Sequence, residues 1–194
     1  QMCIRDRIQP DLREVTPDEV TEYKLGSILN GGGAFPGNNK YATAVEWAET
    51  AETFYQASGH AFEGRGFRIP FAWATDAVHG HNNVFGATVF PHNIGLGAAR
   101  SPDLVRQIGA VTAAEVTATG LDWTFAPTVA VPRDYRWGRV YEGYSEDPAV
   151  VKAYASAMVD GLQGEGAERF GPERVLSTVK HWICLLYTSP SPRD

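Results

Sequence analysis

The sequence predicts an α/β fold built on parallel strands. Short apolar stretches alternate with longer amphipathic stretches along the chain, the order expected when each strand is followed by a helix. One apolar stretch, residues 69–75, is nearly continuous, as in strands that are buried on both faces. Two helix starts are marked by a capping residue followed by proline, at Ser101-Pro102 and Asp147-Pro148. Together these observations favour regular alternation of strands and helices.

The first predicted strand covers residues 26–30. It ends at residues 31–39, a segment rich in glycine and asparagine that is typical of a turn and lacks the Gly-Lys-Ser/Thr ending of a phosphate-binding loop. Residues 41–58 predict a helix, because apolar side chains recur there at helical spacing. The face that we expect to be buried comprises Ala44, Val45, Ala48, Ala51, Phe54 and Tyr55.

The second strand, residues 69–75, ends at Asp76. A helix over residues 102–119 follows, and Gly120 ends it. Residues 121–127 then predict the third strand, because they are again mostly apolar and end at a proline.

A second capped helix, residues 148–162, leads to the last predicted strand, residues 175–179, which is closed by Lys180 and His181. The sequence thus predicts four strands joined by helices. Four strands are half of a closed eight-stranded barrel, but an open doubly wound sheet has the same periodicity. Both folds place ligands at the carboxyl ends of their strands, so the pattern alone does not separate them.

Composition predicts a single globular unit. The chain has 194 residues, 43% of them hydrophobic and 21% charged, with a net charge of -6 and a pI near 5.4. Nucleic-acid binding depends on clustered Lys and Arg, whereas the 17 basic residues here are scattered. No apolar run approaches the roughly 18 to 20 residues that span a bilayer. We therefore expect neither a nucleic acid nor a membrane as a partner.

The two ends of the sequence share an unusual origin. The nucleotide sequence CAG-ATG-TGT-ATA-AGA-GAC-AG would encode residues 1–7 (QMCIRDR), and the reverse complement of its core, TGT-CTC-TTA-TAC-ACA-TCT, would encode residues 184–189 (CLLYTS). Termini related in this way are expected from translation of a sequencing adaptor. We therefore expect residues 1–7 and 184–194 to be adaptor-derived and residues 8–183 to form the domain. Both cysteines, Cys3 and Cys184, then lie outside it, so cysteine usage does not indicate a redox compartment.

Polar side chains follow three of the predicted strands. Asp76 follows the second, a segment that begins at Arg133 follows the third, and Lys180 and His181 follow the fourth. In a parallel sheet these groups converge at one mouth. Charged groups of both signs, together with aromatic side chains, suit a polyhydroxylated ligand, whose hydroxyls both donate and accept. The same spacing is equally compatible with a structural Asp76–Arg133 ion pair and a core histidine at position 181.

Five ordered stretches resemble signature motifs of glycoside hydrolase family 3. They are residues 76–83 (DAVHGHNN), 90–97 (FPHNIGLG), 133–139 (RDYRWGR), 141–148 (YEGYSEDP) and 180–181 (KH). The resemblance covers nearly all of residues 8–183 and is strongest to β-glucosidases and exo-β-glucanases. It implies the first half of a TIM-type (β/α)8 barrel, incomplete, as a partial N-terminal catalytic domain.

This resemblance implies a retaining, exo-acting enzyme that hydrolyses terminal β-D-glucosidic bonds without a cofactor or metal. Asp76, Arg133, Lys180 and His181 are implied to bind hydroxyls of glucose in the first subsite. The family's aspartate nucleophile and glutamate acid/base would lie beyond Ile183. A retaining mechanism needs two carboxyls about 5 Å apart, so we expect this chain to be inactive by itself. The expected substrates are β-glucosides or β-gluco-oligosaccharides, and the expected location is periplasmic or extracellular.

Other interpretations use the same residues. His79, His81 and Lys180 could bind a metal, as in amidohydrolase-type barrels, although His79 lies three residues past its strand. Lys180 could form a Schiff base, as in aldolase-type barrels. Glu142 and Glu146 could form a catalytic pair, although Glu142 more simply orders the arginine-rich loop. A non-catalytic carbohydrate-binding protein is also compatible, but half a barrel would leave two sheet edges open.

Overall fold

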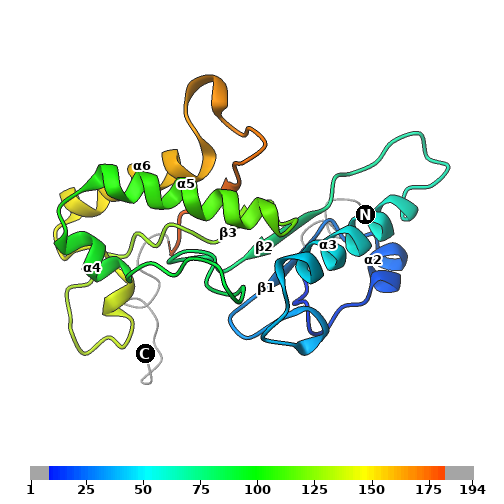
Figure 1. Cartoon of the computed structure of the whole chain (residues 1–194), viewed down its shortest axis with the longest axis horizontal. Helices are drawn as coiled ribbons and strands as arrows, with labels where there is room; N and C mark the ends of the chain where they lie inside the picture. The colour runs from blue at the N-terminus through cyan, green and yellow to red at the C-terminus, as the bar shows by residue number, and fades with distance from the viewer. Residues whose placement is uncertain (1–8, 182–194) are drawn as a thin grey trace.

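The computed structural model describes residues 9–181 of the chain, so the ends expected to be adaptor-derived, residues 1–7 and 184–194, lie outside the described part. A four-stranded parallel sheet in the order β1-β2-β3-β4 forms its centre (Figure 1). The strands are β1 (Ser27–Asn30), β2 (Ala72–Thr75), β3 (Trp123–Thr124) and β4 (Leu176–Ser177). Each pairs in parallel with the next along the chain, which confirms the predicted α/β class.

Helices occupy the connections between strands. The α-helices are α2 (Pro17–Tyr23), α3 (Ala44–His60), α4 (Asn93–Ala98), α5 (Pro102–Ala118) and α6 (Pro148–Gln163), and the short 3-10 helices are η1 (Pro36–Asn38), η2 (Val140–Glu142) and η3 (Gly166–Glu168). The predicted caps are present, because Ser101 accepts a hydrogen bond from the Leu104 amide and Asp147 from the Ala149 amide. Helices α2 and α4, which have only 7 and 6 residues, were not predicted from the sequence.

The strands are shorter than the apolar stretches predict. Residues 69–71 do not pair in β2, and β3 and β4 each have two residues. Pro70 has no N–H to donate to a neighbouring strand. The segments that follow β3 and β4 remain hydrogen-bonded to each other without regular strand pairing. For example, the Lys180 amide donates to the Pro127 carbonyl at 2.9 Å. The peptide bonds Ala126-Pro127 and Lys180-His181 are cis.

A closed core lies between α3 and the first two strands. The ring centroids of Trp47 and Phe54 each lie 5.8 Å from that of Trp73. The indole Nε1 of Trp73 donates to Asn30 Oδ1 at 2.9 Å, and Asn30 Nδ2 donates to Thr75 Oγ1 at 3.0 Å. These polar groups are therefore satisfied although they are buried, so the core does not lose the stability that an unpaired polar group would remove.

The buried face of α3 differs from the predicted one. Its buried residues are Trp47, Ala51, Phe54, Ala57 and Ser58, whereas Val45 is 64% and Tyr55 45% exposed. Ala44 is exposed as well, so the prediction that Ala44, Val45 and Tyr55 are buried was wrong. Small and branched apolar residues on the outer face gave the same helical spacing as the true core face, and the position of Trp73 decides which face is covered.

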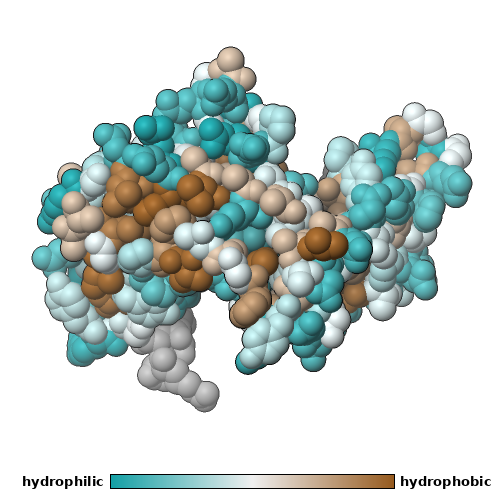
Figure 2. Space-filling model, viewed as in Figure 1, coloured by the Kyte–Doolittle hydropathy of each residue, from teal (hydrophilic) through white to brown (hydrophobic). Residues whose placement is uncertain are grey.

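Helices α5 and α6 pack closely on each other at the opposite end of the sheet (Figure 1). A Cβ on Gly161 would lie 2.2 Å from the carbonyl oxygen of Arg106, so only glycine permits this approach. Figure 2 shows apolar surface over α4, α5 and α6. Exposed apolar side chains there include Ile94, Leu104 and Val111. Among residues 9–181, no helix is long and apolar enough to cross a membrane.

One edge of the sheet is covered by another segment of the chain, and the other edge is exposed. Beside β1, the Leu12 amide donates to the Leu29 carbonyl at 2.8 Å and the Leu29 amide donates to the Pro10 carbonyl at 3.0 Å. The chain before α2 thus covers that edge. On the other side, Leu176 of β4 is 45% exposed and Val179 is 41% exposed. An edge of this kind is where further strands can pair.

Candidate functional site

Asp76 and Lys180 meet although 104 positions separate them in sequence. Asp76 directly follows β2, Lys180 lies shortly after β4, and Lys180 Nζ donates to Asp76 Oδ1 at 2.5 Å. The Lys180 backbone is held in turn, because its carbonyl accepts from the Val129 amide at 2.5 Å. The ion pair therefore bridges the ends of two strands across β3, as convergence at the carboxyl ends of parallel strands predicts.

Arg139 is the guanidinium that contacts His181, and it was not among the residues predicted from the sequence. Arg139 Nη2 lies 3.4 Å from His181 Nε2. Because a guanidinium only donates, Nε2 must be the accepting nitrogen and the ring proton of neutral His181 lies on Nδ1. Arg139 belongs to the same arginine-rich loop as Arg133, and the signal that could have selected it is the glutamate three positions later, Glu142.

Glu142 forms a bidentate ion pair with Arg139. Nε of Arg139 donates to Glu142 Oε1, and Nη2 donates to Oε2 at 2.7 Å. The backbone carbonyl of Glu142 accepts from Nδ2 of the buried Asn93 at 2.8 Å. The prediction that Glu142 orders the arginine-rich loop is thus confirmed. Glu146 instead accepts from the Tyr135 hydroxyl at 3.0 Å, so the two glutamates have different partners.

The electrostatics of these groups follow from their shared charges. Burial alone would raise the pKa of Glu142, but the hydrogen bond and charge of Arg139, with the charges of Lys180 and His181, lower it overall. Burial, followed by the charges of Lys180 and Arg139, lowers the pKa of His181, and Glu142 and Asp76 oppose this shift. The site thus combines the ionised carboxylate of Glu142 with a neutral imidazole of His181 near pH 7.

Arg133 lies exposed in the segment between β3 and η2. Of the four residues predicted to bind sugar, the structure joins Asp76 to Lys180, and it places His181 against Arg139. The role of Arg133 stays a prediction.

The metal-binding interpretation of His79 and His81 is not supported. His81 is fully buried, and its Nε2 lies 2.8 Å from Thr119 Oγ1. Because that hydroxyl donates to the Val116 carbonyl at 2.7 Å, it must accept from His81. His79 instead lies against His92. Within the described part of the chain, no group of three or more His, Cys, Asp or Glu side chains could hold a metal ion.

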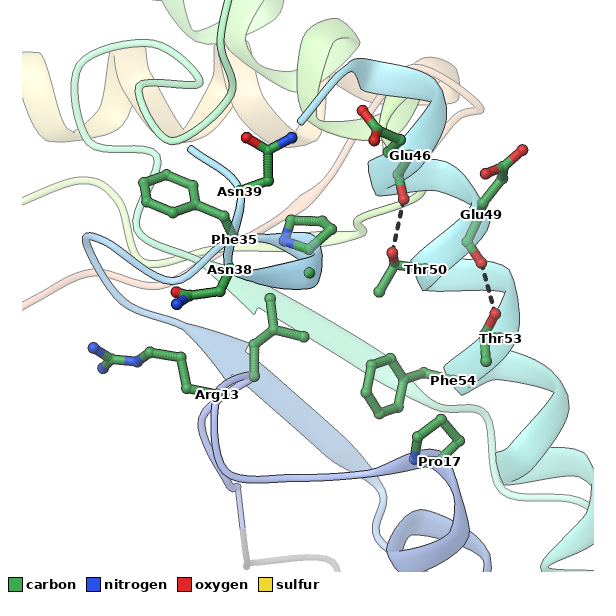
Figure 3. Close-up of a pocket in the computed structure, with 13 residues that line it drawn as sticks. Arg13, Pro17, Phe35, Asn38, Asn39, Glu46, Glu49, Thr50, Thr53 and Phe54 are labelled. Atoms are coloured by element: carbon green, nitrogen blue, oxygen red, sulfur yellow. Dashed lines mark hydrogen bonds between the residues drawn. The ribbon is translucent and has the colours of Figure 1, made fainter. Parts of the chain in front are cut away.

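A groove of about 880 Å³ lies on a different part of the molecule, beside α3 (Figure 3). Phe35 and Asn38 face the helix across it, and Arg13 lies at one end (Figure 3). The hydroxyls of Thr50 and Thr53 on the helix wall donate to carbonyls of α3 itself, at 2.7 and 2.9 Å. The lining contains none of the residues of the Asp76–Lys180 site, so we do not assign the groove to that site.

Comparison with known families identifies the fold. Residues 4–187 match the model of the glycosyl hydrolase family 3 N-terminal domain. The chain belongs to this family. Family 3 enzymes are glycoside hydrolases whose N-terminal domain is a TIM-type α/β barrel, so the parallel sheet is part of a barrel and not the start of a doubly wound sheet. The predicted fold class, the first half of a TIM-type barrel, is thereby confirmed.

Curated relatives and solved structures agree with this assignment. The chain is 33% identical over 166 residues to a lysosomal β-glucosidase of Dictyostelium discoideum, covering 83% of this chain and 20% of the relative. It is 40% identical over 116 residues to a periplasmic β-glucosidase of Salmonella typhimurium, covering 59% and 14%. The crystal structure of an exo-1,3/1,4-β-glucanase from a Pseudoalteromonas species matches with 50% identity and a TM-score of 0.87, over 92% of this chain and 22% of that one.

A β-glucosidase from Listeria innocua, solved in complex with glucose, matches with 29% identity and a TM-score of 0.66, over 92% of this chain and 24% of that one. The chain thus spans between about a seventh and a quarter of the length of these proteins. The alternatives of a metal-dependent amidohydrolase, an aldolase-type barrel and a non-catalytic binding module find no support among them.

Proposed function

We propose that this chain supplies the sugar-holding part of the first subsite in a retaining, exo-acting β-glucosidase. The observation that carries the proposal is the Lys180–Asp76 ion pair, which lies at the carboxyl ends of the strands beside the Arg139–His181 contact. Family 3 membership supplies the reaction class, hydrolysis of a glycosidic bond. In this proposal residues 8–183 are the partial N-terminal catalytic barrel domain of a longer enzyme.

The site can hold neighbouring hydroxyls of one sugar ring. Each hydroxyl both donates and accepts, so one hydroxyl can donate to the Asp76 carboxylate and a neighbouring one can accept from the Lys180 ammonium, both in charge-assisted hydrogen bonds. Asp76 keeps a second oxygen that can accept, and the ammonium keeps further N–H groups that can donate. Nδ1–H of His181 adds a donor whose direction is set by Arg139 on the other side of the ring. Arg133 is proposed to contribute at the exposed rim.

The cleaving groups are proposed to come from outside this chain. A retaining mechanism needs a nucleophilic carboxylate and a second carboxyl that stays protonated long enough to act as an acid. Glu142 does not suit the acid role, because Arg139 and the other nearby cations lower its pKa. Asp76 is already paired with Lys180. We therefore propose that the nucleophile and the acid/base lie beyond Ile183 and that the chain alone does not hydrolyse glycosides.

The proposed substrates are β-glucosides or β-gluco-oligosaccharides, without a cofactor. Support comes from the β-glucosidase names of the relatives and from the glucose complex of the Listeria innocua enzyme. A periplasmic or extracellular location is proposed, because the Salmonella typhimurium relative is named as periplasmic.

The test is an assay of the complete reading frame that contains this chain. We expect hydrolysis of an aryl β-D-glucoside, with release of β-glucose as the first product, seen by NMR. Asp76→Asn should lower kcat/KM by about 10- to 100-fold, because Lys180 then loses its charged partner at the sugar. Glu63→Gln, in an exposed turn, is the control and should change little. Faster hydrolysis of an aryl β-xyloside, or release of α-glucose, would contradict the proposal.

A further inference from the structure

His79 is held rigidly in the loop that follows β2. Its backbone carbonyl accepts from the Phe90 amide at 2.8 Å, and its side-chain Nδ1 lies 3.0 Å from the Phe90 carbonyl oxygen. A carbonyl only accepts, so the ring proton lies on Nδ1 and Nε2 is unprotonated in the neutral form. Gly80 next to it has φ of +92°, and a Cβ there would lie 2.0 Å from the Thr88 carbonyl oxygen. Residues 79–80 and 88–90, the two segments of this loop, therefore cannot separate without breaking both hydrogen bonds.

Three rings from three separate segments stack beside this loop. The centroid of His79 lies 4.1 Å from that of His92, with 32° between the ring planes. His92 directly precedes α4 and meets the edge of Tyr141 at 4.7 Å and 81°. Tyr141 belongs to η2, the 3-10 turn of the arginine-rich loop. The stack thus connects the loop after Asp76 to the turn that carries Glu142.

Two close contacts hold the turn and the residues that follow it against α4. Asn93 holds the Glu142 carbonyl at 2.8 Å, and a Cβ on Gly97 would lie 1.7 Å from the Tyr144 carbonyl oxygen. Glu142 in turn holds Arg139, which contacts His181. A displacement of the turn would therefore be passed on to the ring of His181.

We propose that His79, His92 and Tyr141 form a positioning stack that aligns the turn carrying Arg139 and Glu142 with the loop carrying Asp76, and that sugar affinity depends on the stack being uncharged. This inference rests on the proposed function, since it concerns the same sugar site. None of the three residues is placed in contact with the sugar. They act through Glu142 and Arg139.

Protonation is the change that would loosen the stack. The titratable groups that face His92 are His79 from the loop after β2, and Tyr141 and Glu142 from η2. Burial and the nearby His79 lower the pKa of His92, and the charge of Glu142 only partly opposes this. The ring of His92 is therefore neutral at pH 7. As the pH falls below the ordinary histidine range, a second positive charge 4.1 Å from the first would push the rings apart.

The experiment compares two variants of the complete enzyme at about pH 7.5 and about pH 5. His92→Phe keeps a ring in the stack but cannot be charged, whereas His92→Ala removes the ring. We expect KM of the wild type to rise about threefold to tenfold more than KM of His92→Phe between the two pH values. His92→Ala should raise KM about tenfold at both, with a smaller change in kcat. Identical pH profiles of KM for the wild type and His92→Phe would overturn the proposal.

A second measurement does not depend on activity. Histidine titration by NMR on this chain should show the pKa of His92 rising in His79→Phe, because the neighbouring positive charge is gone. His60→Phe, at the end of α3, is the matched control and should leave that pKa unchanged. An unchanged His92 pKa in His79→Phe would overturn the proposed coupling. If the coupling is present but the complete enzyme does not hydrolyse β-glucosides, the proposed function is wrong, whereas the interaction between the two histidines still stands.

Discussion

The two halves of the sheet are built differently. Strands β1 and β2 pair over four residues, and the side chains behind them are enclosed by α3, with Ile28 and Trp47 fully buried. Strands β3 and β4 pair over two residues, and Leu176 on β4 is 45% exposed. Asp76 follows the first half, whereas Lys180 and His181 follow the second. The candidate site therefore combines a carboxylate that follows the enclosed half of the sheet with ammonium and imidazole groups that follow the half with the open edge.

We infer from this difference that the enclosed half provides most of the free energy of folding, whereas the open half provides the groups that complete the candidate site. The enclosed half buries large apolar side chains and satisfies its polar groups, so most single changes there should cost stability. The open half supplies the Lys180 and Arg139 contacts of the candidate site, but it buries fewer apolar side chains than the enclosed half. Four predictions, in order of decreasing expected effect, probe that comparison.

Trp47→Ala should have the largest effect. It removes a fully buried ring that contacts Trp73 and His81, so the free energy of unfolding should fall by about 3 to 5 kcal/mol. Urea unfolding followed by circular dichroism measures this loss. Val45→Ala, on the 64% exposed outer face of the same helix, is the matched control and should cost less than about 0.5 kcal/mol. Equal losses would mean that α3 does not pack with the face seen here.

His81 predicts acid sensitivity of the enclosed half. Burial lowers the pKa of its imidazole from the ordinary 6.5 to about 4, so folding favours the neutral ring. The stabilisation is complete above pH 6.5 and is lost as the pH falls toward 4, by about 3 kcal/mol in total. His81→Gln should flatten this part of the stability profile, and His60→Gln should not. A profile that is equally steep in His81→Gln would assign the acid sensitivity to other groups.

The helix caps test whether the halves unfold together. Thr43→Ala removes the capping box of α3, and Asp147→Ala removes the cap of α6. Each should cost about 1 kcal/mol. If the sheet unfolds as one unit, both changes shift a single transition equally. Two transitions, each shifted by only one of the variants, would show that the enclosed and open halves are separate cooperative units.

Leu176→Gln should have the smallest effect on stability. Because the side chain is 45% exposed on the open edge, the free energy of unfolding of this chain should change by less than about 0.5 kcal/mol. The same change in the complete enzyme should cost more if a further strand covers this edge. Equal small effects in both would show that the edge of β4 stays open.

Much of the fold could be predicted from local signals. The capping residues Ser101 and Asp147 begin α5 and α6 as predicted, because caps depend on neighbours within one turn. The capping box of α2, in which Thr16 and Glu19 bond reciprocally, was also present in the sequence and was not used. Strand lengths and the buried face of α3 were predicted less well, since both depend on distant partners such as Trp73.

The candidate site shows the same division. Asp76, Lys180 and His181 could be selected because they follow strands, and the ends of parallel strands converge. Arg139 could not be separated from Arg133, because two guanidiniums six positions apart in one irregular loop have no periodicity to distinguish them. The ion pair with Glu142 and the clamp from Asn93 decide that Arg139 contacts His181.

The sequence by itself determined the alternation of strands and helices, the family, and the residues at the strand ends, because these depend on short-range pattern and motif. Only the tertiary structure decided which groups touch. His79 and His81 illustrate the reason, since they are two positions apart and yet one joins a ring stack near the mouth while the other is buried against Thr119. Contacts across 38 and 42 positions, such as His81 with Thr119 and Arg139 with His181, are set by packing and have no local signature.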